Sequence, residues 1–281
     1  MRRTALPLLA VLLLSACGSG SAATGGKLEV IAAAYPFAWL AQQVGGPDVV
    51  VTDLVKAGAE PHDVELTPRQ VGAVQRAAVV VHLKGFQPAV DDVLQGGSQG
   101  YDLGAVVGQL PDKDPHVWLD PVRMQAAATG LADRLAAKDP KHAAGYRARA
   151  KAVATALGAL DTTFTTALTR CARRDIVTSH SAFGYLADRY DLVQRGISGL
   201  TPDAEPSPRR VAEVAKFAKA TGVTTIFFES LVDPKVARTV AAEIGAKTAV
   251  LDPVEGVTGD DDYLSVQRRN AQALHAALGC A

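Results

Sequence analysis

Residues 140–168, PKHAAGYRARAKAVATALGALDTTFTTAL, lie in the middle of the chain and decide how the rest is organised. Apolar residues recur there at steps of three and four, the spacing of one face of an α-helix. They are Tyr146, Ala150, Val153, Leu157, Leu160, Phe164 and Leu168. Pro140 suits the first helical turn, and at 1.5 Å per residue the helix is about 40 Å long. Because no Gly, Ser or Pro run interrupts it, we expect a rigid connector between two bodies that move little.

Short β-branched runs alternate with helical patterns on both sides of this connector. Before it, the pattern predicts strands over 28–33, 49–55 and 78–83, with helices over 37–44 and 68–76. After it, the pattern predicts strands over 175–179, 224–228 and 247–251, with helices over 182–189, 208–220 and 234–244. Such alternation is typical of parallel α/β sheets. The sequence therefore predicts an α/β fold of two lobes with parallel sheets, joined by a single long rigid helix.

The first seventeen residues differ from the rest. Arg2 and Arg3 form a basic start, residues 5–14 are apolar, and Leu-Ser-Ala-Cys ends at Cys17. A membrane span needs about 20 apolar residues, so this run predicts a signal peptide. The tetrapeptide resembles the bacterial lipobox, in which the cysteine thiol is lipidated and cleavage leaves Cys17 as the new amino terminus. The alternative is an ordinary secretory signal with an accidental cysteine.

These patterns divide the chain into five parts. They are a signal peptide with its lipobox (1–17), a flexible tether (18–27), an N-terminal α/β lobe (28–139), the linker helix (140–168) and a C-terminal α/β lobe (169–281). A lipid on Cys17 would anchor the mature protein to the cell membrane at its extracytoplasmic face.

Composition limits the classes of partner. The chain has 281 residues, enough for two domains at about 150 residues each, and 29 Lys+Arg balance 29 Asp+Glu. Because the net charge is zero, there is no global field to attract DNA, RNA or an anionic membrane surface. We therefore expect no nucleic-acid partner, and contact with the membrane only through the lipid.

Two cysteines remain once Cys17 is assigned to lipid. An even pair in an exported protein suggests a disulfide between Cys171 and Cys280. The alternative is two free thiols. Neither cysteine has a neighbouring cysteine or histidine at a spacing suited to zinc or redox catalysis.

Three of the six histidines stand at boundaries of predicted elements. His62 follows the second predicted strand, His116 stands in a proline-flanked segment, and His180 ends the strand over 175–179. Ligands of open α/β sheets bind at the carboxyl ends of strands, where Glu229 and Asp252 also lie. If the lobes face each other, their cleft holds three imidazoles and at least one carboxylate, which is a ligand set for a transition metal.

Local enzyme motifs are missing from the sequence. It contains no His-Glu-x-x-His, no Gly-x-Ser-x-Gly, no Walker loop and no dinucleotide-binding glycine pattern. We therefore expect a binding protein and no catalytic residues. The rival interpretation is a surface zinc hydrolase, in which three histidines hold the metal and Asp252 or Glu229 acts as a base.

Several long phrases resemble the metal-binding substrate-binding proteins of ABC importers for zinc and manganese, known as cluster A-I. The phrases are GAEPHDVELTP (58–68), DPHVWLDP (114–121), TSHSAFGYL (178–186) and FFES (227–230), followed by the segment 252–270. They occur in order and cover nearly all of the mature chain. The resemblance implies two α/β lobes joined by one long helix, with a metal bound between them and delivered to a membrane permease.

Carried over position by position, the resemblance implies His62, His116, His180 and Asp252 as metal ligands. Glu60 is a substitute for Asp252 as the fourth ligand, and Glu229 is a candidate to orient a histidine N–H from outside the ligand set. Zinc-type members have histidine at the third ligand position, so His180 favours Zn²⁺ over Mn²⁺. A manganese-binding member of the same family is the first alternative, and a surface adhesion protein is another. We expect a monomer.

Overall fold

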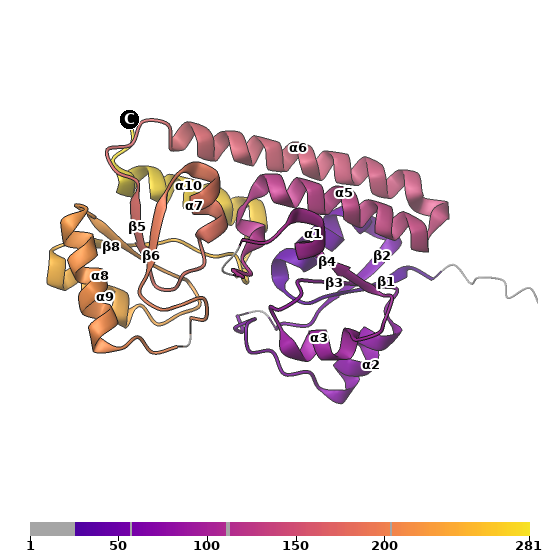
Figure 1. Ribbon diagram of the computed structural model, residues 1–281. Helices are drawn as coiled ribbons and strands as arrows, with labels where there is room; N and C mark the ends of the chain where they lie inside the picture. The colour runs from indigo at the N-terminus through magenta and orange to yellow at the C-terminus, as the bar shows by residue number, and fades with distance from the viewer. Residues whose placement is uncertain (1–25, 57, 111–112, 203) are drawn as a thin grey trace, which may run out of the picture.

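The computed structural model describes residues 26–56, 58–110, 113–202 and 204–281, and it contains two α/β lobes side by side (Figure 1). The predicted signal peptide, Cys17 and most of the tether lie outside these residues. In the described part of the chain, no helix is both long enough and apolar enough to cross a membrane.

The N-terminal lobe is built on a parallel four-stranded sheet in the order β2-β1-β3-β4. Its strands are β1 (Leu28–Ala32), β2 (Val49–Asp53), β3 (Val79–His82) and β4 (Gly100–Asp102). Its helices are α1 (Tyr35–Gly45), α2 (Pro68–Arg76), α3 (Pro88–Leu94) and α4 (Leu103–Val107), with a short 3₁₀ turn, η1 (Gly46–Asp48). Strand β3 is buried along its whole length, as expected for a parallel sheet with helices on both faces.

The C-terminal lobe repeats the same strand order, β6-β5-β7-β8, again all parallel. Its strands are β5 (Asp175–Thr178), β6 (Val193–Gly196), β7 (Thr225–Phe228) and β8 (Lys247–Val250). Its helices are α7 (Gly184–Tyr190), α8 (Pro208–Ala220) and α9 (Lys235–Ile244). Because the strands of each sheet are parallel, their carboxyl ends lie together at one edge of the sheet. The loops that follow them in the two lobes can therefore reach a common site.

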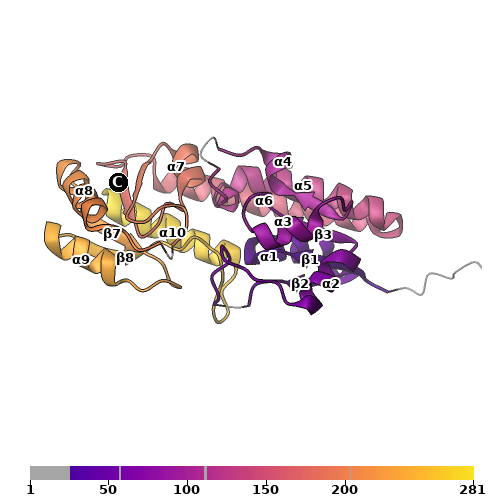
Figure 2. The same cartoon turned by 60° about the horizontal axis from the view of Figure 1, so that its bottom comes forward.

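The connector is helix α6 (Ala143–Ala167), preceded by a 3₁₀ turn, η3 (Pro140–His142). It runs along one side of both lobes, with α5 (Pro121–Lys138) packed beside its N-terminal half and the C-terminal helix α10 (Tyr263–Leu278) near its other end (Figures 1 and 2). Its apolar stripe is buried, as the spacing predicts: Tyr146, Ala150, Val153, Leu157, Leu160 and Phe164. The predicted α/β fold with two parallel sheets and one long joining helix is confirmed.

Most of the buried apolar side chains form one core that runs through the N-terminal lobe, the helical layer and the near side of the C-terminal lobe. A second, smaller core fills the outer part of the C-terminal lobe under α8 and α9. The large core therefore supports both sides of the cleft between the lobes. A further 3₁₀ turn, η2 (Val117–Leu119), is fully buried there.

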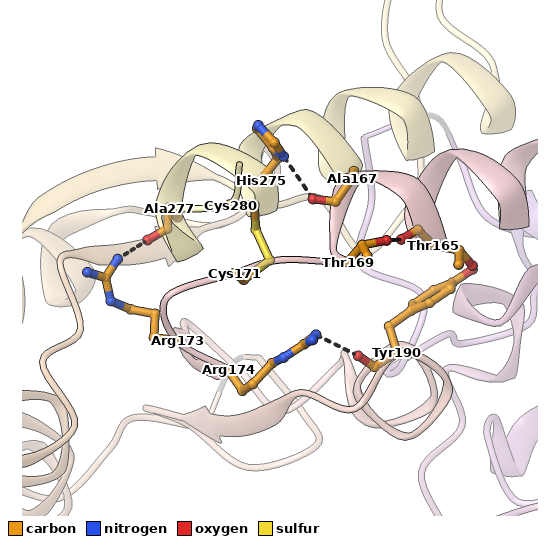
Figure 3. The surroundings of a disulfide bond; sticks show 10 residues. All are labelled: Thr165, Ala167, Thr169, Cys171, Arg173, Arg174, Tyr190, His275, Ala277 and Cys280. Carbon is orange, nitrogen blue, oxygen red and sulfur yellow. Dashed lines mark hydrogen bonds between the residues drawn. A yellow bond between two sulfur atoms is a disulfide. The ribbon is translucent and has the colours of Figure 1, made fainter.

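A disulfide joins Cys171, just after α6, to Cys280, just after α10, as predicted. Around it, His275 Nδ1 bonds the Ala167 carbonyl at 2.8 Å and Arg173 donates to the Ala277 carbonyl at 2.8 Å (Figure 3). These bonds fasten the end of α10 to the segment that leaves the connector, so the last helix and the connector are held together.

Two strands and several helices were not predicted from the sequence. Strand β4, GYD, has no β-branched residue and strand β6, VQRG, has one, so neither shows the β-branched run that marks a strand in this sequence. Helix α5 was also missed, although Asp120 caps its N-terminus by accepting from the backbone N–H groups of Val122 and Arg123. Asp120 followed by proline is a helix-start signal in the sequence.

Candidate metal centre

Four side chains from distant parts of the chain meet in the cleft between the lobes: His62, His116, His180 and Glu255. One potential ligand atom from each lies within 4.8 Å of the others, and all four residues are buried. They come from the loop after β2, the start of η2, the end of the β5 segment and the loop between β8 and α10. Among the described residues, this is the one group of three or more His, Cys, Asp and Glu that meets this distance limit.

His116 is fully buried and held by a carboxylate. Asp114 Oδ1 accepts both from the backbone N–H of His116, at 2.8 Å, and from its ring Nδ1, at 2.6 Å. Gly184 at the start of α7 makes room for this carboxylate, because a Cβ there would lie 2.3 Å from Asp114 Oδ2. The Nε2 atom of His116 is thereby fixed toward the centre of the cluster.

His180 is held in the same way from the other lobe. It is fully buried, and its Nδ1 donates to Glu229 Oε1 at 2.7 Å. Glu229 follows β7, the strand next to β5, so the parallel sheet itself sets the two residues side by side. The expectation that Glu229 orients a histidine N–H therefore agrees with this contact, which is the usual arrangement around metal-binding histidines.

His62 is held more loosely than the other two histidines. Its side chain packs edge-on against Phe86, with ring centroids 4.9 Å apart, and the residue is 8% exposed. Glu60 Oε1 accepts from the His62 backbone N–H at 2.9 Å and lies 3.9 Å from its Nε2. Glu60 therefore supports the loop through the backbone and does not belong to the cluster of four.

Glu255 supplies the carboxylate of the cluster. Its Oε1 lies 3.0 Å from His116 Nε2, 3.3 Å from His62 Nε2 and 3.7 Å from His180 Nε2. Burial raises the pKa of Glu255, but hydrogen bonds to His116 and His62 outweigh burial and hold this pKa well below its usual range. The group is therefore an anion at neutral pH.

The two fully buried rings are set up to receive a cation. Because a carboxylate only accepts, the Nδ1 atoms of His116 and His180 are the donors to Asp114 and Glu229. In the neutral rings the lone pairs then sit on the Nε2 atoms, which lie 3.2 Å apart. Two lone pairs at this distance repel each other unless a proton or a metal ion lies between them.

In the metal-free chain, the carboxylates on both sides of His116 favour its protonated form. Burial lowers the pKa of this imidazole, but hydrogen bonds to Asp114 and Glu255 outweigh burial and raise it to about 9. A metal ion that binds at this position must therefore displace a proton.

The separations fit a tetrahedral shell. A zinc ion with bonds of 2.0 to 2.1 Å places neighbouring ligand atoms about 3.3 Å apart. Four of the six ligand-atom separations in the cluster range from 3.0 to 3.7 Å, and all six are within 4.8 Å. Three imidazoles and one carboxylate are suitable zinc ligands. The chemistry of the donor set and its spacing thus fit one ion with four protein ligands.

Asp252, which the sequence analysis placed in the ligand set, lies outside the cluster. Its Oδ1 accepts from the Val254 N–H of its own loop at 2.7 Å, and its Oδ2 accepts from the hydroxyl of Ser230 in the loop after β7. Burial raises the pKa of this carboxyl. The loop continues past the end of β8 and turns at Val254, so the structure brings Glu255, three residues further on, to the histidines in its place.

Sequence reasoning missed Glu255 and Asp114. Asp114 stands two residues before His116 in the quoted phrase DPHVWLDP, and a carboxylate this close to a candidate ligand is a signal for an orienting contact. Glu255 carries a weaker signal, because nothing in the segment LDPVEG tells which of its two acids turns toward the cleft.

Known proteins resemble this chain closely. The family model described as "ZnuA: Zinc-uptake complex component A periplasmic" matches residues 30–277. The "High-affinity zinc uptake system protein ZnuA" of Bacillus subtilis (strain 168) is 31% identical over 95% of this chain and 94% of its own length. The "Zinc-binding lipoprotein AdcA" of Streptococcus pneumoniae serotype 4 is 34% identical over 95% of this chain and 58% of its own length. The chain thus spans little more than half the length of the AdcA relatives.

Solved structures of zinc-binding and metal-transporting proteins are also similar to this chain. The Zn(II)-bound ZnuA-like domain of Streptococcus pneumoniae AdcA has a TM-score of 0.80 and 33% identity, over 90% of this chain and 99% of that one. The laminin-binding protein Lmb of Streptococcus agalactiae, titled a bifunctional protein with adhesin and metal transporting activity, has a TM-score of 0.83 and 33% identity, over 89% of this chain and 99% of that one. The chain belongs to the family of ZnuA, the zinc-uptake complex component A.

Proposed function

We propose that this protein captures zinc outside the cytoplasm and delivers it to the permease of an ABC importer. The observation that carries the proposal is the buried cluster of three histidines and one glutamate, whose ligand atoms lie within 4.8 Å of one another. Membership in a family named for zinc uptake supports the same function. Such a family supplies a transport binding protein, so the alternative of a surface hydrolase is set aside.

In this proposal His62, His116, His180 and Glu255 are the four zinc ligands. The histidines bind as neutral rings through Nε2, and the carboxylate of Glu255 provides one negative charge. Asp114 and Glu229 are bonded to the far side of two rings and orient them toward the ion. Four protein ligands leave no position for the water that hydrolysis needs, so the site is suited to capture without chemistry.

We propose zinc as the cargo, with manganese as the weaker competitor. Imidazole nitrogen suits zinc, whereas manganese prefers oxygen ligands, and zinc binds such a site more tightly in the general order of divalent metals. Titration of the metal-free protein with zinc in the presence of excess manganese tests this choice. We expect one equivalent of zinc to bind with little effect of manganese; displacement of zinc by equimolar manganese would contradict it.

We propose that the mature protein is a monomer anchored by a lipid on Cys17. The lipobox-like sequence around Cys17 and the name of the lipoprotein AdcA of Streptococcus pneumoniae support this anchor. Cell fractionation tests it: we expect the wild-type protein in the membrane fraction and Cys17→Ala protein released or unprocessed. An unchanged membrane location of Cys17→Ala would contradict lipidation at this residue.

Delivery to a permease is tested in cells. Deletion of the gene should cause a growth defect under chelation that added zinc rescues, and a copy with His116→Ala should not restore growth. A deletion strain that grows normally under chelation would contradict a main role in zinc import.

Adhesion is a second candidate, because the similar protein Lmb is titled both an adhesin and a metal transporter. Direct binding of the purified protein to immobilised laminin tests it, with His116→Ala protein as the matched control for a dependence on zinc. Absence of binding at micromolar protein concentration would remove this candidate.

A further inference from the structure

The residue directly before Glu255 has an unusual backbone conformation. Val254 has φ +60°, in the left-handed region, and its side chain is fully buried. Among the described residues other than glycine, two more have positive φ, Lys113 and Asp191. Aspartate tolerates this region, whereas for a β-branched side chain it is a strained outlier. Something must therefore hold Val254 in this conformation.

The side chains of Asp252 and Asn270 hold the loop from one side. Asp252 Oδ1 accepts from the Val254 N–H at 2.7 Å. Asn270 on α10 bonds both backbone groups of residue 252, donating to its carbonyl at 2.7 Å and accepting from its N–H at 2.9 Å. Asn270 is 2% exposed, so these bonds are shielded from water. We call these two side chains the loop clasp.

Trp118 holds the loop from the other side. Its indole N–H donates to the Pro253 carbonyl at 2.7 Å, and its own carbonyl accepts from the hydroxyl of Tyr263 at 2.5 Å. Trp118 lies two residues after His116. The position of Glu255 is thus tied both to the segment that carries His116 and to helix α10.

The loop has space to move on its outer side. A cavity of about 460 Å³ is lined by Asp252, Gly256, Val257, Asn270 and other residues of the loop and α10. If the loop clasp opens, Val254 can relax from the left-handed region and the loop can shift toward this cavity. Glu255 would then leave the three histidines.

We propose that Asp252 and Asn270 are positioning residues, which keep Val254 in its strained conformation and thereby hold the Glu255 carboxylate at the metal. This inference rests on the proposed zinc function and adds a release step to it: opening the clasp removes one ligand while the histidines stay in place. It also assigns Asp252 a role other than that of a ligand.

Two substitutions of Asp252 separate a positioning role from a ligand role. An amide oxygen can accept from the Val254 N–H but is a poor zinc ligand, so Asp252→Asn should keep the zinc Kd within about threefold of wild type, whereas Asp252→Ala should weaken it about 10- to 100-fold, the usual effect of losing an orienting partner. A loss in Asp252→Asn as large as in Asp252→Ala would overturn the proposal and point to Asp252 as a ligand.

A double-mutant cycle tests whether the clasp acts through Val254. Asn270→Ala should weaken zinc about 10- to 100-fold in the wild-type background and speed zinc release to a chelator by a similar factor. In the Val254→Gly background the same substitution should cost less than about threefold, because glycine adopts positive φ without strain. An equal loss in both backgrounds would overturn the proposal, as would wild-type affinity in Asn270→Ala.

Visible absorption of the Co²⁺-loaded variants reads the ligand set directly. Asn270→Ala and Asp252→Ala should lose the intensity typical of tetrahedral cobalt, and Asp191→Gly should keep it. Asp191→Gly is the matched control, since it changes another residue of positive φ at the end of α7, away from the cluster. Intact tetrahedral spectra in both alanine variants would overturn the proposal. If the wild-type protein fails to bind zinc or cobalt, the proposed function fails instead.

Discussion

The four members of the metal cluster fall into two pairs that are held differently. His116 and His180 are fully buried, and each has a carboxylate bonded to the nitrogen opposite the cluster. His62 and Glu255 stand in loops and are held indirectly. The His62 ring packs against Phe86 and its backbone N–H bonds Glu60, and Glu255 is placed by bonds to the backbone of the residues before it. We call the first pair the anchored pair and the second the loop pair.

This difference separates two requirements of the proposed transport function. The anchored pair brings one ligand from each lobe, with its tautomer already set, so it forms a preorganised half site. The loop pair completes the shell, and in the proposed release step Glu255 leaves it while the three histidines stay in place. In the proposed function, capture and release therefore rest on different residues.

The sharpest way to break this comparison is to remove the three histidines one at a time, two from the anchored pair and one from the loop pair. Binding of structural zinc is worth about 10 to 16 kcal/mol over four ligands, so one ligand contributes on the order of a 10²- to 10³-fold change in Kd. We expect His116→Ala and His180→Ala at or above the upper end and His62→Ala at the lower end, measured by competition with a chelator of known affinity. Equal losses in all three variants would remove the distinction between the pairs.

The next largest changes in zinc affinity are expected for the carboxylates that are bonded to the anchored pair. Asp114→Asn and Glu229→Gln keep the shape of the side chains but remove their charge, and we expect each to weaken zinc about 10- to 100-fold. Glu60→Gln is the matched control, because Glu60 bonds the backbone of His62 and not a ring nitrogen of the anchored pair. Its zinc Kd should stay within about threefold. A larger effect at Glu60 than at Asp114 would reverse the comparison.

We expect low pH to weaken zinc binding, because His116 of the anchored pair takes up a proton. The pKa of His116 is raised to about 9 in the metal-free protein, so below that pH zinc must displace one proton from this ring. The apparent affinity should rise about tenfold per pH unit between pH 6.5 and 9 and level off above, since each bound zinc releases one proton. Calorimetry in buffers of different ionisation enthalpy measures this proton. Affinity independent of pH over that range would contradict the protonation state of His116.

The smallest expected effect comes from a residue that only makes room. A Cβ at Gly184 would clash with Asp114 Oδ2, so Gly184→Ala should displace this carboxylate slightly and weaken zinc by about fivefold, less than the removal of its charge. The zinc Kd measured beside that of Asp114→Asn checks the order. A loss larger than that of Asp114→Asn would indicate that α7 itself had moved.

Sequence reasoning found the three histidines more easily than the whole site. His116, His180 and His62 stand at element boundaries, where parallel sheets place their ligands, and the strand order of the two lobes confirms that geometry. His82 also ends a strand, yet it lies against Asp91 at 3.6 Å, outside the cluster. The position of a histidine along the chain therefore identifies it as a candidate metal ligand. Whether its side chain points into the cluster depends on packing.

The carboxylate was harder to predict for a physical reason. Strand geometry places Asp252 at the end of β8, but the final direction of the loop depends on the turn at Val254. That turn depends on Asn270, which bonds the backbone of Asp252 from eighteen residues further along. A conformation fixed by such a distant contact leaves no local pattern. The long connector, in contrast, has a local period and was predicted with nearly its observed bounds.

X-ray absorption at the zinc edge of the zinc-loaded protein tests the central claim most directly. We predict four-coordinate zinc with three imidazole nitrogens and one carboxylate oxygen at about 2.0 to 2.1 Å, and a reduced oxygen contribution in Glu255→Ala protein alone among variants of acidic residues in the loop. Five- or six-coordinate zinc with bound water, or a first shell unchanged by Glu255→Ala, would contradict the closed site formed by the two pairs.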